Sequence, residues 1–179
     1  MSIAAVVLAA GGSSRWDGNG HKLLAELKGR PLAAWAINAA AAARLDELVV
    51  VTGLADVAHL VPPGATIVHN PNWAEGQAGS LQVAVERCQQ VGHSSFVVGL
   101  ADMPGVPAVA WQSVAQAAGE LVTATFSGRR RPPVKVGAVL WGQLPTTGDR
   151  GARDLLINEH RLVVEVACRG RGEDIDTLE

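Results

Sequence analysis

Three stretches of the chain are continuously apolar, rich in β-branched residues and about as long as a strand. They cover residues 3–8 (IAAVVL), 48–52 (LVVVT) and 96–100 (FVVGL). Their apolar residues do not alternate with polar ones, as they would in a strand that has one face in water. Unbroken runs of this kind are typical of strands that are buried on both faces of a parallel sheet.

Helical segments separate these apolar runs. Residues 31–45 begin with a proline and are rich in alanine, which favours a helix. Residues 80–90 and 107–119 predict two more helices. Strands and helices in alternation predict βαβ units, and therefore a three-layer α/β/α fold.

The later part of the chain has a different order. Strands are expected at residues 134–140 and 162–167, with a helix near residues 150–159 between them. These elements should complete a mixed, mostly parallel sheet. The three arginines at 129–131, between a glycine and two prolines, indicate a loop. Because no linker or repeat interrupts the pattern, residues 1–179 predict a single domain.

Composition and charge exclude several classes of protein. The chain has 179 residues and a formal net charge of -2 at pH 7, whereas nucleic-acid binding normally needs a basic surplus. Cys88 and Cys168 lie far apart and belong to no metal-binding pattern, as expected for reduced thiols in a cytoplasmic protein. The apolar N-terminus lacks a basic start, and the apolar helix at 32–45 is too short to span a bilayer, so no membrane association is expected.

The first candidate site is the segment LAAGGSSRWDGNGHK at residues 8–22. A buried strand leads there into small residues, which let the backbone approach a ligand closely and offer N–H groups to phosphate. Arg15 and Lys22 would neutralise the charge of a triphosphate. The segment is neither a dinucleotide fingerprint nor a Walker A loop, because GxGxxG and GxxxxGK[ST] are both absent. The alternative is an ordinary flexible loop between a strand and a helix.

Acidic residues in two segments are candidate metal ligands. Asp102, in the sequence GLADMP, follows a buried strand at the edge where open α/β sheets bind ligands. A lone carboxylate there suits Mg²⁺, which takes few protein ligands, although Asp102 could instead cap the helix that follows. Asp174 and Asp176 are two residues apart, so on an extended segment they point the same way and either could supply a second carboxylate. The alternative for both is a solvated acidic tail.

Residues 70–81 should line the same pocket. Gly76, Gln77 and Ser80 lead into a helix N-terminus, whose exposed N–H groups favour an anionic or carbonyl partner. The alternative is an asparagine–proline turn followed by a simple helix cap. Trp73, in the same segment, is expected to pack against the protein rather than to stack on a base.

Other polar residues have less distinctive surroundings. Asp149 and Arg150, with Arg153, could bind the phosphate of an acceptor, or they could form the charged first turn of a helix. The histidines form no ligand cluster and are expected to be surface or loop residues. They are His21, His59, His69, His93 and His160.

Five motifs follow one another along nearly the whole chain. They are LAAGGSSR with the later Lys22, NPNWAEG with Ser80-Leu81, ADMP, GDRGAR and DIDT. Together they resemble the MobA-like NTP transferase family, and most closely its molybdenum cofactor cytidylyltransferases. The chain departs from the family pattern where Arg131-Pro132-Pro133 replaces a glycine–histidine–proline motif, and where one or two extra residues separate Arg15 from Lys22.

The resemblance implies a Rossmann-like nucleotidyltransferase fold and an enzyme that transfers a nucleoside monophosphate from an NTP, with CTP expected, to a phosphorylated acceptor such as molybdopterin. Residues expected to bind the nucleotide are Leu8, Ala9, Ala10, Gly11, Gly12, Ser13, Arg15, Lys22, Asn70, Gly76, Gln77 and Ser80. Lys22, Asp102 and Arg15 are the expected catalytic residues, and Asp149 and Arg150 are expected to bind the acceptor. Mg²⁺ is the expected cofactor, held by Asp102 with Asp176 or Asp174.

Two alternatives to this function remain at the level of sequence. The missing histidine keeps open another phosphorylated acceptor, such as a sugar phosphate, or guanylyl transfer. A different class is a non-catalytic nucleotide-binding accessory protein, with a molybdenum enzyme or its chaperone as partner. The presence of both Asp102 and Lys22 argues against this second alternative, because a protein that only binds a nucleotide has no need of both.

Overall fold

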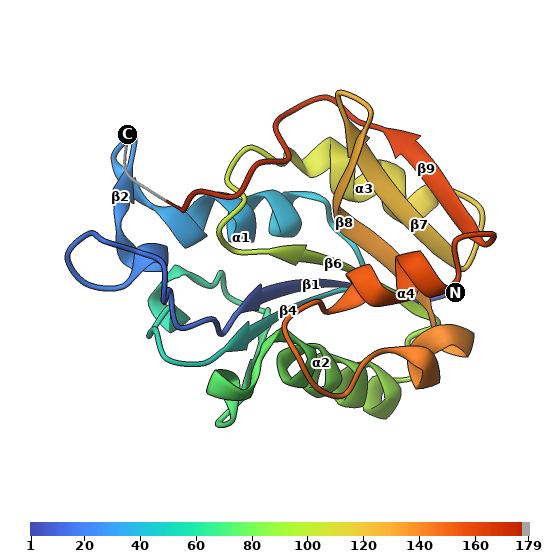
Figure 1. The fold of residues 1–179 in the computed structure, drawn as a ribbon, viewed down its shortest axis with the longest axis horizontal. Helices are drawn as coiled ribbons and strands as arrows, with labels where there is room; N and C mark the ends of the chain where they lie inside the picture. The colour runs from blue at the N-terminus through green and yellow to red at the C-terminus, as the bar shows by residue number, and fades with distance from the viewer. Residues whose placement is uncertain (177–179) are drawn as a thin grey trace.

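A seven-stranded β-sheet runs through the middle of the molecule, as seen in the computed structural model, which describes residues 1–176 (Figure 1). Its strands lie in the order β5 (Thr66–His69), β4 (Glu47–Thr52), β1 (Ile3–Ala9), β6 (Ser95–Leu100), β8 (Arg129–Gly137), β7 (Leu121–Phe126) and β9 (Val163–Ala167). The strands from β5 to β6 are parallel, β8 is antiparallel to both neighbours, and β9 is parallel to β7. The expected mixed, mostly parallel sheet is thus confirmed.

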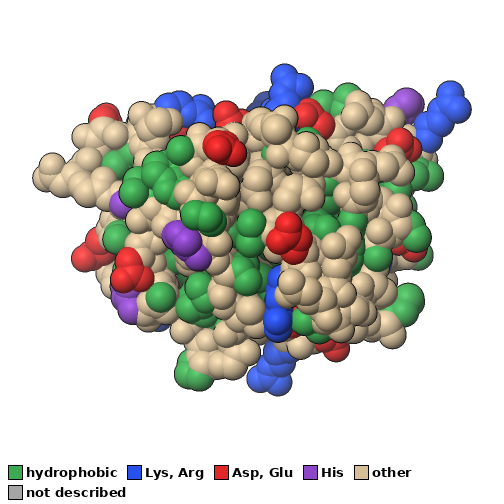
Figure 2. All heavy atoms as spheres, turned by 90° about the horizontal axis from the view of Figure 1, so that it is seen from below, with side chains coloured by type: hydrophobic (Ala, Val, Ile, Leu, Met, Phe, Trp, Pro, Cys, Tyr) green, Lys and Arg blue, Asp and Glu red, His purple; other side chains and the backbone are tan. Residues whose placement is uncertain are grey.

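Helices cover both faces of this sheet and enclose two apolar cores. α1 (Leu32–Ala42) and α3 (Ala108–Gln116) pack on one face, where Ile37 and Trp111 are fully buried. α2 (Gln77–Val91) and α4 (Ala152–Asn158) pack on the other, where Leu81 and Leu155 are buried. On the face that carries α2, charged side chains of both signs are dispersed among small hydrophobic areas (Figure 2). The three-layer α/β/α architecture follows from the burial of both sheet faces.

The direction in which the chain leaves the central strand creates a crevice. From β1 the chain passes through α1 to β4 on one side of β1, and it later returns to β6 on the other side. In open α/β sheets, ligands bind at such a switch point, beyond the carboxyl ends of the strands. Short elements surround this edge: the 3-10 turn η1 (Lys22–Leu24), the hairpin β2 (Glu26–Leu27) and β3 (Arg30–Pro31), and the 3-10 turn η3 (Trp73–Glu75).

The expectation that residues 129–131 form a loop is wrong, because all three arginines lie in β8. The turn consists of the two residues before the arginines, Ser127 and Gly128, which both have positive φ and join Phe126 to its partner Arg129. Two-residue hairpins favour this left-handed backbone. The strand ends at Gly137, where the chain enters the 3-10 helix η4 (Ala138–Gln143). β8 therefore both begins and ends earlier than the strand expected at 134–140.

Several other elements differ from the sequence-based expectation. β7 was not expected, although the sequence LVTATF contains alternating threonines, and neither was the edge strand β5. The helix expected near residues 150–159 begins at Ala152, so Asp149 and Arg150 precede it. Within residues 1–176, no helix is both long and apolar enough to cross a bilayer. Thr177, the last residue of the DIDT motif, lies outside the described residues.

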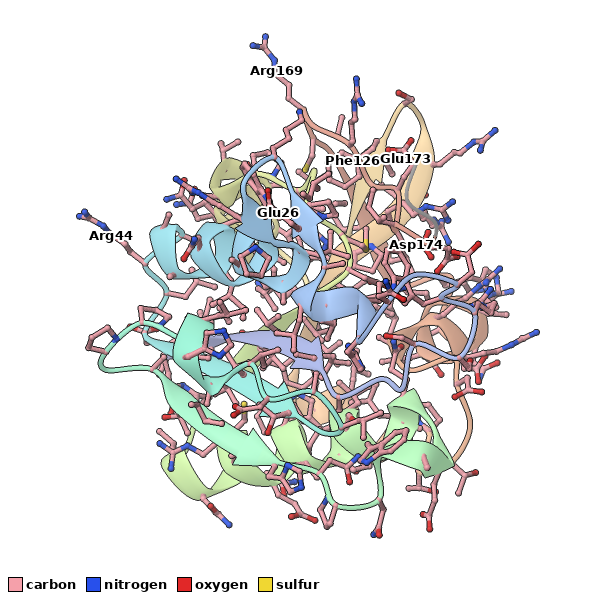
Figure 3. The ribbon with its side chains drawn as sticks, turned by 90° about the vertical axis from the view of Figure 1, so that its left-hand side faces the viewer. Glu26, Arg44, Phe126, Arg169, Glu173 and Asp174 are labelled. Carbon is pink, nitrogen blue, oxygen red and sulfur yellow. The ribbon has the colours of Figure 1, made fainter. Side chains whose placement is uncertain are left out.

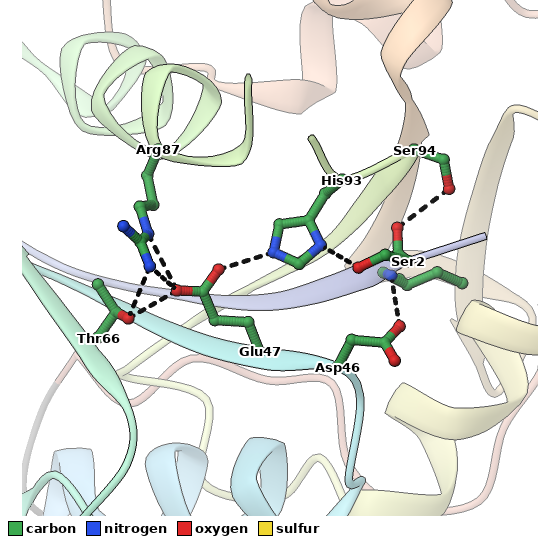
Figure 4. Close-up of polar contacts among 8 residues, drawn as sticks. Ser2, Asp46, Glu47, Thr66, Arg87, His93 and Ser94 are labelled. Carbon is green, nitrogen blue, oxygen red and sulfur yellow. Dashed lines mark hydrogen bonds and ion pairs between the residues drawn. The ribbon is translucent and has the colours of Figure 1, made fainter. Parts of the chain in front are cut away.

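A polar network joins the amino ends of β4 and β5 to α2, at the end of the sheet opposite to the carboxyl ends of these strands (Figure 4). One carboxylate oxygen of Glu47 accepts hydrogen bonds from Arg87 at 2.6 and 2.9 Å and from the hydroxyl of Thr66 at 2.6 Å. The other oxygen lies 2.7 Å from Nε2 of His93, whose Nδ1 contacts the hydroxyl of Ser2. His93 lies in a loop, as expected, but its side chain is only 2% exposed, so the expectation of a surface position does not hold for it.

The network keeps Glu47 ionised. Burial would by itself raise the pKa of Glu47, but hydrogen bonds from Thr66, His93 and Arg87 outweigh it, so this pKa lies below its usual value. A carboxylate with a lowered pKa stabilises the fold above the pKa of the unfolded chain, and this contribution is lost as the pH falls through the folded value. Glu47 should therefore contribute to stability at neutral pH and progressively less below about pH 4.

We expect Glu47→Gln to lower the free energy of unfolding at pH 7 by about 2 kcal/mol, because it removes charged hydrogen bonds and leaves Arg87 with a neutral partner. The difference from the unsubstituted protein should shrink as the pH falls toward 3. Urea unfolding at pH 7, 5 and 3 measures both effects. Glu86→Gln is the control, since Glu86 is exposed on α2. An equal loss at all three pH values would contradict the role of the ionised carboxylate.

Candidate functional site

A cleft of about 680 Å³ opens at the carboxyl edge of β1 and β6. Figure 3 looks toward this edge of the sheet, and Asp174 is labelled there. The cleft walls come from the loop after β1, η1, the junction of η3 with α2, the segment after β6, and the C-terminal segment. The lining residues are Leu8, Ala10, Gly11, Gly12, Ser13, Ser14, Arg15, Trp16, Lys22, Leu23, Trp73, Ala74, Gly76, Gln77, Ser80, Leu100, Asp102, Asp149, Asp174 and Asp176.

Three carboxylates from two distant parts of the chain meet in this cleft. Asp102, Asp174 and Asp176 each place an oxygen within 4.8 Å of the others. Asp102 follows β6, and the backbone before it is fixed by a hydrogen bond from Ala101 N–H to the carbonyl of Leu8, at 3.1 Å. The structure thus brings together the acidic residues that the sequence singled out separately. Asp102 does not cap α3, because no side-chain cap hydrogen bond is present at that helix.

The C-terminal segment is held against the end of β6 by its backbone. Ile175 donates its N–H to the carbonyl of Asp102 at 3.0 Å, and Arg171 donates to the carbonyl of Gly105 at 2.9 Å. A side chain at position 105 would meet Arg171 at 2.7 Å, so the close approach requires glycine there. The acidic pair is therefore part of a docked segment, and the alternative of a solvated tail does not hold for residues up to 176.

The side chain of Lys22 lies among these carboxylates. Its ammonium is 2.9 Å from Oδ2 of Asp102 and 3.0 Å from Oδ1 of Asp176, and its side chain is only 11% exposed. Burial would by itself lower the pKa of Lys22, but the hydrogen bonds and charges of the two aspartates outweigh it and raise this pKa. The same ammonium, chiefly through its hydrogen bond, lowers the pKa of Asp176, and Arg15 at 4.0 Å adds to this effect.

The donor set fits a hard divalent cation. Mg²⁺ and Mn²⁺ prefer carboxylate oxygens, and Mg²⁺ is bound by one or two protein carboxylates together with water and substrate phosphates. Mg²⁺ holds such oxygens at about 2.0–2.1 Å. Lys22 contacts two of the same carboxylates, so a metal that uses those oxygens would require the ammonium to withdraw. The ammonium of Lys22 could then form an ion pair with the phosphates of a bound nucleotide.

The glycine-rich loop after β1 forms the wall beside these charges. Gly11, Gly12 and Ser13 all line the cleft. Trp73 packs across Gly12, where an added Cβ would lie 2.5 Å from the indole ring. Glycine is therefore required at position 12 by this packing, and Trp73 packs against the protein as expected while it also borders the cleft.

The N-terminus of α2 has a carbonyl partner from within the chain. Ala78 donates its backbone N–H to the carbonyl of Gly148 at 2.9 Å. Gly76 has φ of +117°, and a side chain there would meet that same carbonyl at 2.5 Å and the carboxylate of Asp149 at 2.8 Å. The loop before α4 is thus packed onto the start of α2. It closes this side of the cleft and places Asp149 in the lining.

Two residues expected at the nucleotide site lie behind the cleft surface. Asn70 is buried, donates from Nδ2 to the hydroxyl of Ser80 at 2.9 Å, and accepts from the N–H of Asn72 at 3.0 Å. Its amide therefore orders the turn before η3, and only Ser80 of this pair reaches the lining. Ala9, at the end of β1, is likewise buried and outside the lining.

A second cavity of about 620 Å³ adjoins the first. The two share Leu8, Gln77, Leu100, Asp149 and Asp174. Its floor is apolar, and four arginines from β8 and the start of α4 line it, namely Arg130, Arg131, Arg150 and Arg153. Arg130 pairs with Glu165 and Arg150 with Asp154, whereas Arg131 and Arg153 form no ion pair with the residues that the structure describes.

Sequence reasoning missed the contribution of β8 to this second cavity. Arg131 belonged to a run expected to be a loop, although its place in the motif where the family has glycine–histidine–proline was a usable signal. Arg150, expected at the acceptor, lines the second cavity and not the first, and Asp149 lines both. Arg150 therefore lines a different cavity from Lys22 and Arg15, and the substrate role of each stays a prediction.

Comparison with known proteins identifies the family of the chain. Residues 5–163 match the model of the MobA-like NTP transferase domain. The chain is 31% identical over 195 residues to the nicotine blue oxidoreductase of Paenarthrobacter nicotinovorans. This match covers 99% of this chain and 93% of that protein.

Solved structures share the fold over nearly the whole chain. The crystal structure of Rv0371c from Mycobacterium tuberculosis H37Rv has a TM-score of 0.81 and 26% identity, and the match covers 99% of this chain and 94% of that one. A manganese complex of Rv0371c has a TM-score of 0.78 at 22% identity, covering 98% and 94% of the two chains. The nucleotidyltransferase type of α/β fold is confirmed by this likeness.

We expect Lys22→Met to change the binding of metal and of nucleotide in opposite directions. Without nucleotide, Mn²⁺ should bind more tightly, by roughly tenfold or about 1.4 kcal/mol, because the carboxylates lose a competing positive charge. NTP binding should weaken by about 1.5–3 kcal/mol, because one charge-assisted phosphate contact is lost. Calorimetric titrations with Mn²⁺ alone and with NTP measure the two effects.

The exposed Lys28 provides the control variant Lys28→Met, which should leave both affinities unchanged. Weaker Mn²⁺ binding by Lys22→Met would show that the ammonium orients the carboxylates for the metal. Unchanged NTP affinity would remove Lys22 from the nucleotide site.

Proposed function

Because the chain belongs to the MobA-like NTP transferase family, we propose that it is a divalent-metal-dependent nucleotidyltransferase that transfers CMP from CTP to a phosphorylated acceptor such as molybdopterin or the molybdenum cofactor. One observation carries the proposal: Lys22 and three carboxylates lie beside a glycine-rich loop at the carboxyl edge of the sheet. Positive and acidic groups are thereby arranged where a triphosphate with its metal would lie. The proposed location is the cytoplasm, where NTPs are available.

The reaction needs positioning and charge stabilisation rather than a general base. A phosphate oxygen of the acceptor attacks the α-phosphorus of the NTP, the bond to the β-phosphate oxygen breaks, and pyrophosphate leaves. The attacking oxygen already carries negative charge at neutral pH, so no side chain has to remove a proton. Lys22 and Arg15 neutralise the charge that grows on the departing pyrophosphate, and the N–H groups of the glycine-rich loop hold its phosphates.

Asp102, Asp174 and Asp176 are the residues that would hold the metal. A divalent cation bound there supplies charge neutralisation at the α-phosphate and orients it for attack. The oxygen-only donor set suits Mg²⁺, the most abundant candidate, and Mn²⁺ equally well by chemistry. The manganese complex of the similarly folded Rv0371c supports a divalent cation of this kind.

The acceptor is proposed to bind in the second cavity. The two cavities adjoin at Asp149 and Asp174, so a ligand in each could bring an acceptor phosphate next to the α-phosphate. Arg150, with Arg131 and Arg153, which have no ion-pair partner among residues 1–176, would attract an anionic group, and the apolar floor would contact the body of the acceptor. A molybdenum enzyme or its chaperone is the proposed recipient of the product.

The nicotine blue oxidoreductase supports a second candidate, an oxidoreductase activity, because it is 31% identical over nearly the full chain. The carboxylate cluster separates the two candidates. Hydride transfer does not require a metal ion at the three aspartates, whereas nucleotidyl transfer depends on a divalent metal ion. Transfer to a sugar phosphate, guanylyl transfer and a non-catalytic accessory role are the remaining alternatives.

The decisive measurement is pyrophosphate release by the purified protein from CTP, GTP, UTP and ATP in turn, with molybdopterin, molybdenum cofactor and sugar phosphates as acceptors. Release that requires both an NTP and an acceptor supports the proposal and identifies both substrates. Absence of release in every combination, together with consumption of a nicotinamide donor in the presence of nicotine blue, would overturn it.

We expect Asp102→Asn to lower the turnover rate by roughly a hundredfold or more with Mg²⁺, because a positioned metal supplies several kcal/mol of transition-state stabilisation. The melting temperature without metal should fall only slightly, because the loss of the ion pair between Asp102 and Lys22 is offset by weaker repulsion within the acidic cluster and the shape of the side chain is kept. Turnover and thermal melting, each with and without Mg²⁺, test this.

Asp17→Asn is the matched control, since Asp17 is an exposed acid in the loop beside the cleft and lies outside the carboxylate cluster. Normal turnover by Asp102→Asn would remove Asp102 from the metal site. A variant that is inactive because it no longer folds would show that the residue is structural.

We expect Arg150→Ala to raise the KM for the acceptor about tenfold and to leave the KM for the NTP nearly unchanged. The reason is that Arg150 lines only the second cavity, where a lost charge-assisted contact costs about 1.5 kcal/mol or more. Saturation curves for each substrate separate the two effects. Arg161→Ala, at an exposed arginine outside both cavities, is the control. A selective loss of NTP binding would reverse the assignment of the cavities.

A further inference from the structure

The loop between β1 and η1 has few attachments of its own. Residues 11–20 form no helix or strand. Within residues 1–176, their backbone makes one hydrogen bond to another backbone group, from Trp16 N–H to the carbonyl of Ser13. Ser13 has φ of +55°, in the left-handed region that residues with a side chain rarely adopt. A loop of this kind needs an external contact to hold one conformation, and the cleft depends on it for Gly11, Gly12 and Arg15.

His21 supplies such a contact. Nε2 of its ring lies 2.8 Å from the carbonyl oxygen of Gly11, and Nδ1 accepts the backbone N–H of Leu23 at 3.2 Å. The hydroxyl of Ser13 also lies against the ring, 3.3–3.4 Å from both nitrogens. The imidazole is therefore placed between the start of the glycine-rich loop and the turn η1.

The two ring contacts determine the form of the histidine. Nδ1 accepts a hydrogen bond from Leu23, so in the neutral ring the proton is on Nε2, which then donates to the Gly11 carbonyl. Both contacts are hydrogen bonds only in this one tautomer. The expectation that His21 is simply a loop residue therefore misses its function as a link between two segments.

The link couples the two halves of the proposed triphosphate site. In a trans peptide the C=O and N–H groups point in opposite directions, so holding the Gly11 carbonyl also determines the direction of the Gly12 N–H. At the same time His21 is the N-cap of η1, whose first residue is Lys22. One side chain thus sets the backbone donors of the loop and the ammonium relative to each other.

We infer that His21 is a positioning residue for the NTP, which acts through Gly11 and Lys22 and does not touch the reacting atoms. The inference rests on the proposed function, because it assumes that the glycine-rich loop and Lys22 bind the triphosphate. A merely structural histidine would affect folding and nucleotide affinity together. A positioning histidine affects nucleotide affinity mainly through its Nε2 contact with Gly11, whereas its cap contact with Leu23 mainly affects folding.

Three variants separate the two ring contacts. The carboxamide of His21→Asn can still accept the Leu23 N–H, since asparagine is a favoured N-cap, but it is too short to replace Nε2 at Gly11. The longer side chain of His21→Gln can place an amide N–H where Nε2 lies, but it is a poor cap. His21→Ala removes both contacts. His160→Asn, at an exposed histidine outside both cavities, is the control.

The experiment measures the affinity of each variant for CTP, GTP, UTP and ATP with Mg²⁺ by calorimetry, its KM and kcat, and its melting temperature without ligand. For the NTP that the unsubstituted protein binds most tightly, we expect Kd and KM to rise about tenfold in His21→Ala and His21→Asn and about twofold in His21→Gln. The kcat at saturating NTP should change much less. The melting temperature should follow the cap instead, and remain closest to that of the unsubstituted protein in His21→Asn.

The opposite pattern would overturn the inference. If His21→Asn restores both the melting temperature and the NTP affinity, His21 is only a cap. Lys22→Met serves as the reference for the proposed function. If that variant binds NTP normally, or if the unsubstituted protein binds none of the four, the nucleotide site itself is wrongly placed and the inference fails with it. If Lys22→Met loses affinity while His21→Ala does not, the inference alone fails.

Discussion

Three carboxylates can share one edge of a sheet only if positive charge lies among them. Here the ammonium of Lys22 performs this function, with contacts of 2.9 and 3.0 Å to Asp102 and Asp176. Without it, the mutual repulsion of the acids would oppose docking of the C-terminal segment against the end of β6. The position of Lys22 in turn depends on η1 and on the conformation of the loop before it. The acidic cluster, the loop and the last described residues therefore form one interdependent arrangement at the edge of the sheet.

The rest of the fold provides fixed supports for this arrangement. β1 and β6 are buried on both faces, so their carboxyl ends are held by the two cores. The loop at Gly148 packs on the start of α2 and carries Asp149, which lines both the cleft and the second cavity. The charges of the two cavities also differ: the first holds the carboxylate cluster with Lys22 and Arg15, and the second holds four arginines beside the two aspartates that it shares with the first. This difference would direct a metal–nucleotide complex and an anionic acceptor to separate places.

Much of this architecture could be predicted from the sequence. The unalternating runs at β1, β4 and β6 predicted buried parallel strands, and the position of Asp102 just after β6 predicted an acid at the ligand-binding edge. The parts that could not be predicted depend on contacts between distant residues. No local pattern indicates that Lys22 reaches Asp176, that Asn70 turns inward to Ser80, or that Arg131 belongs to a strand that lines a second cavity. His21 looked unremarkable because its importance comes from a carbonyl group ten residues earlier.

The docking of the C-terminal segment has a consequence for how the protein is made. Lys22 and Asp176 are separated by 154 positions in the chain, and synthesis at about 5–20 residues per second covers that distance in roughly 8–30 s. During this time the nascent chain can already pair β1 with β4 and β6, yet its lysine has only one of the two carboxylates that it finally contacts. The central strands of the sheet can therefore pair before Asp174 and Asp176 have been synthesised, and a chain interrupted before residue 174 would lack two of the three carboxylates of the cluster.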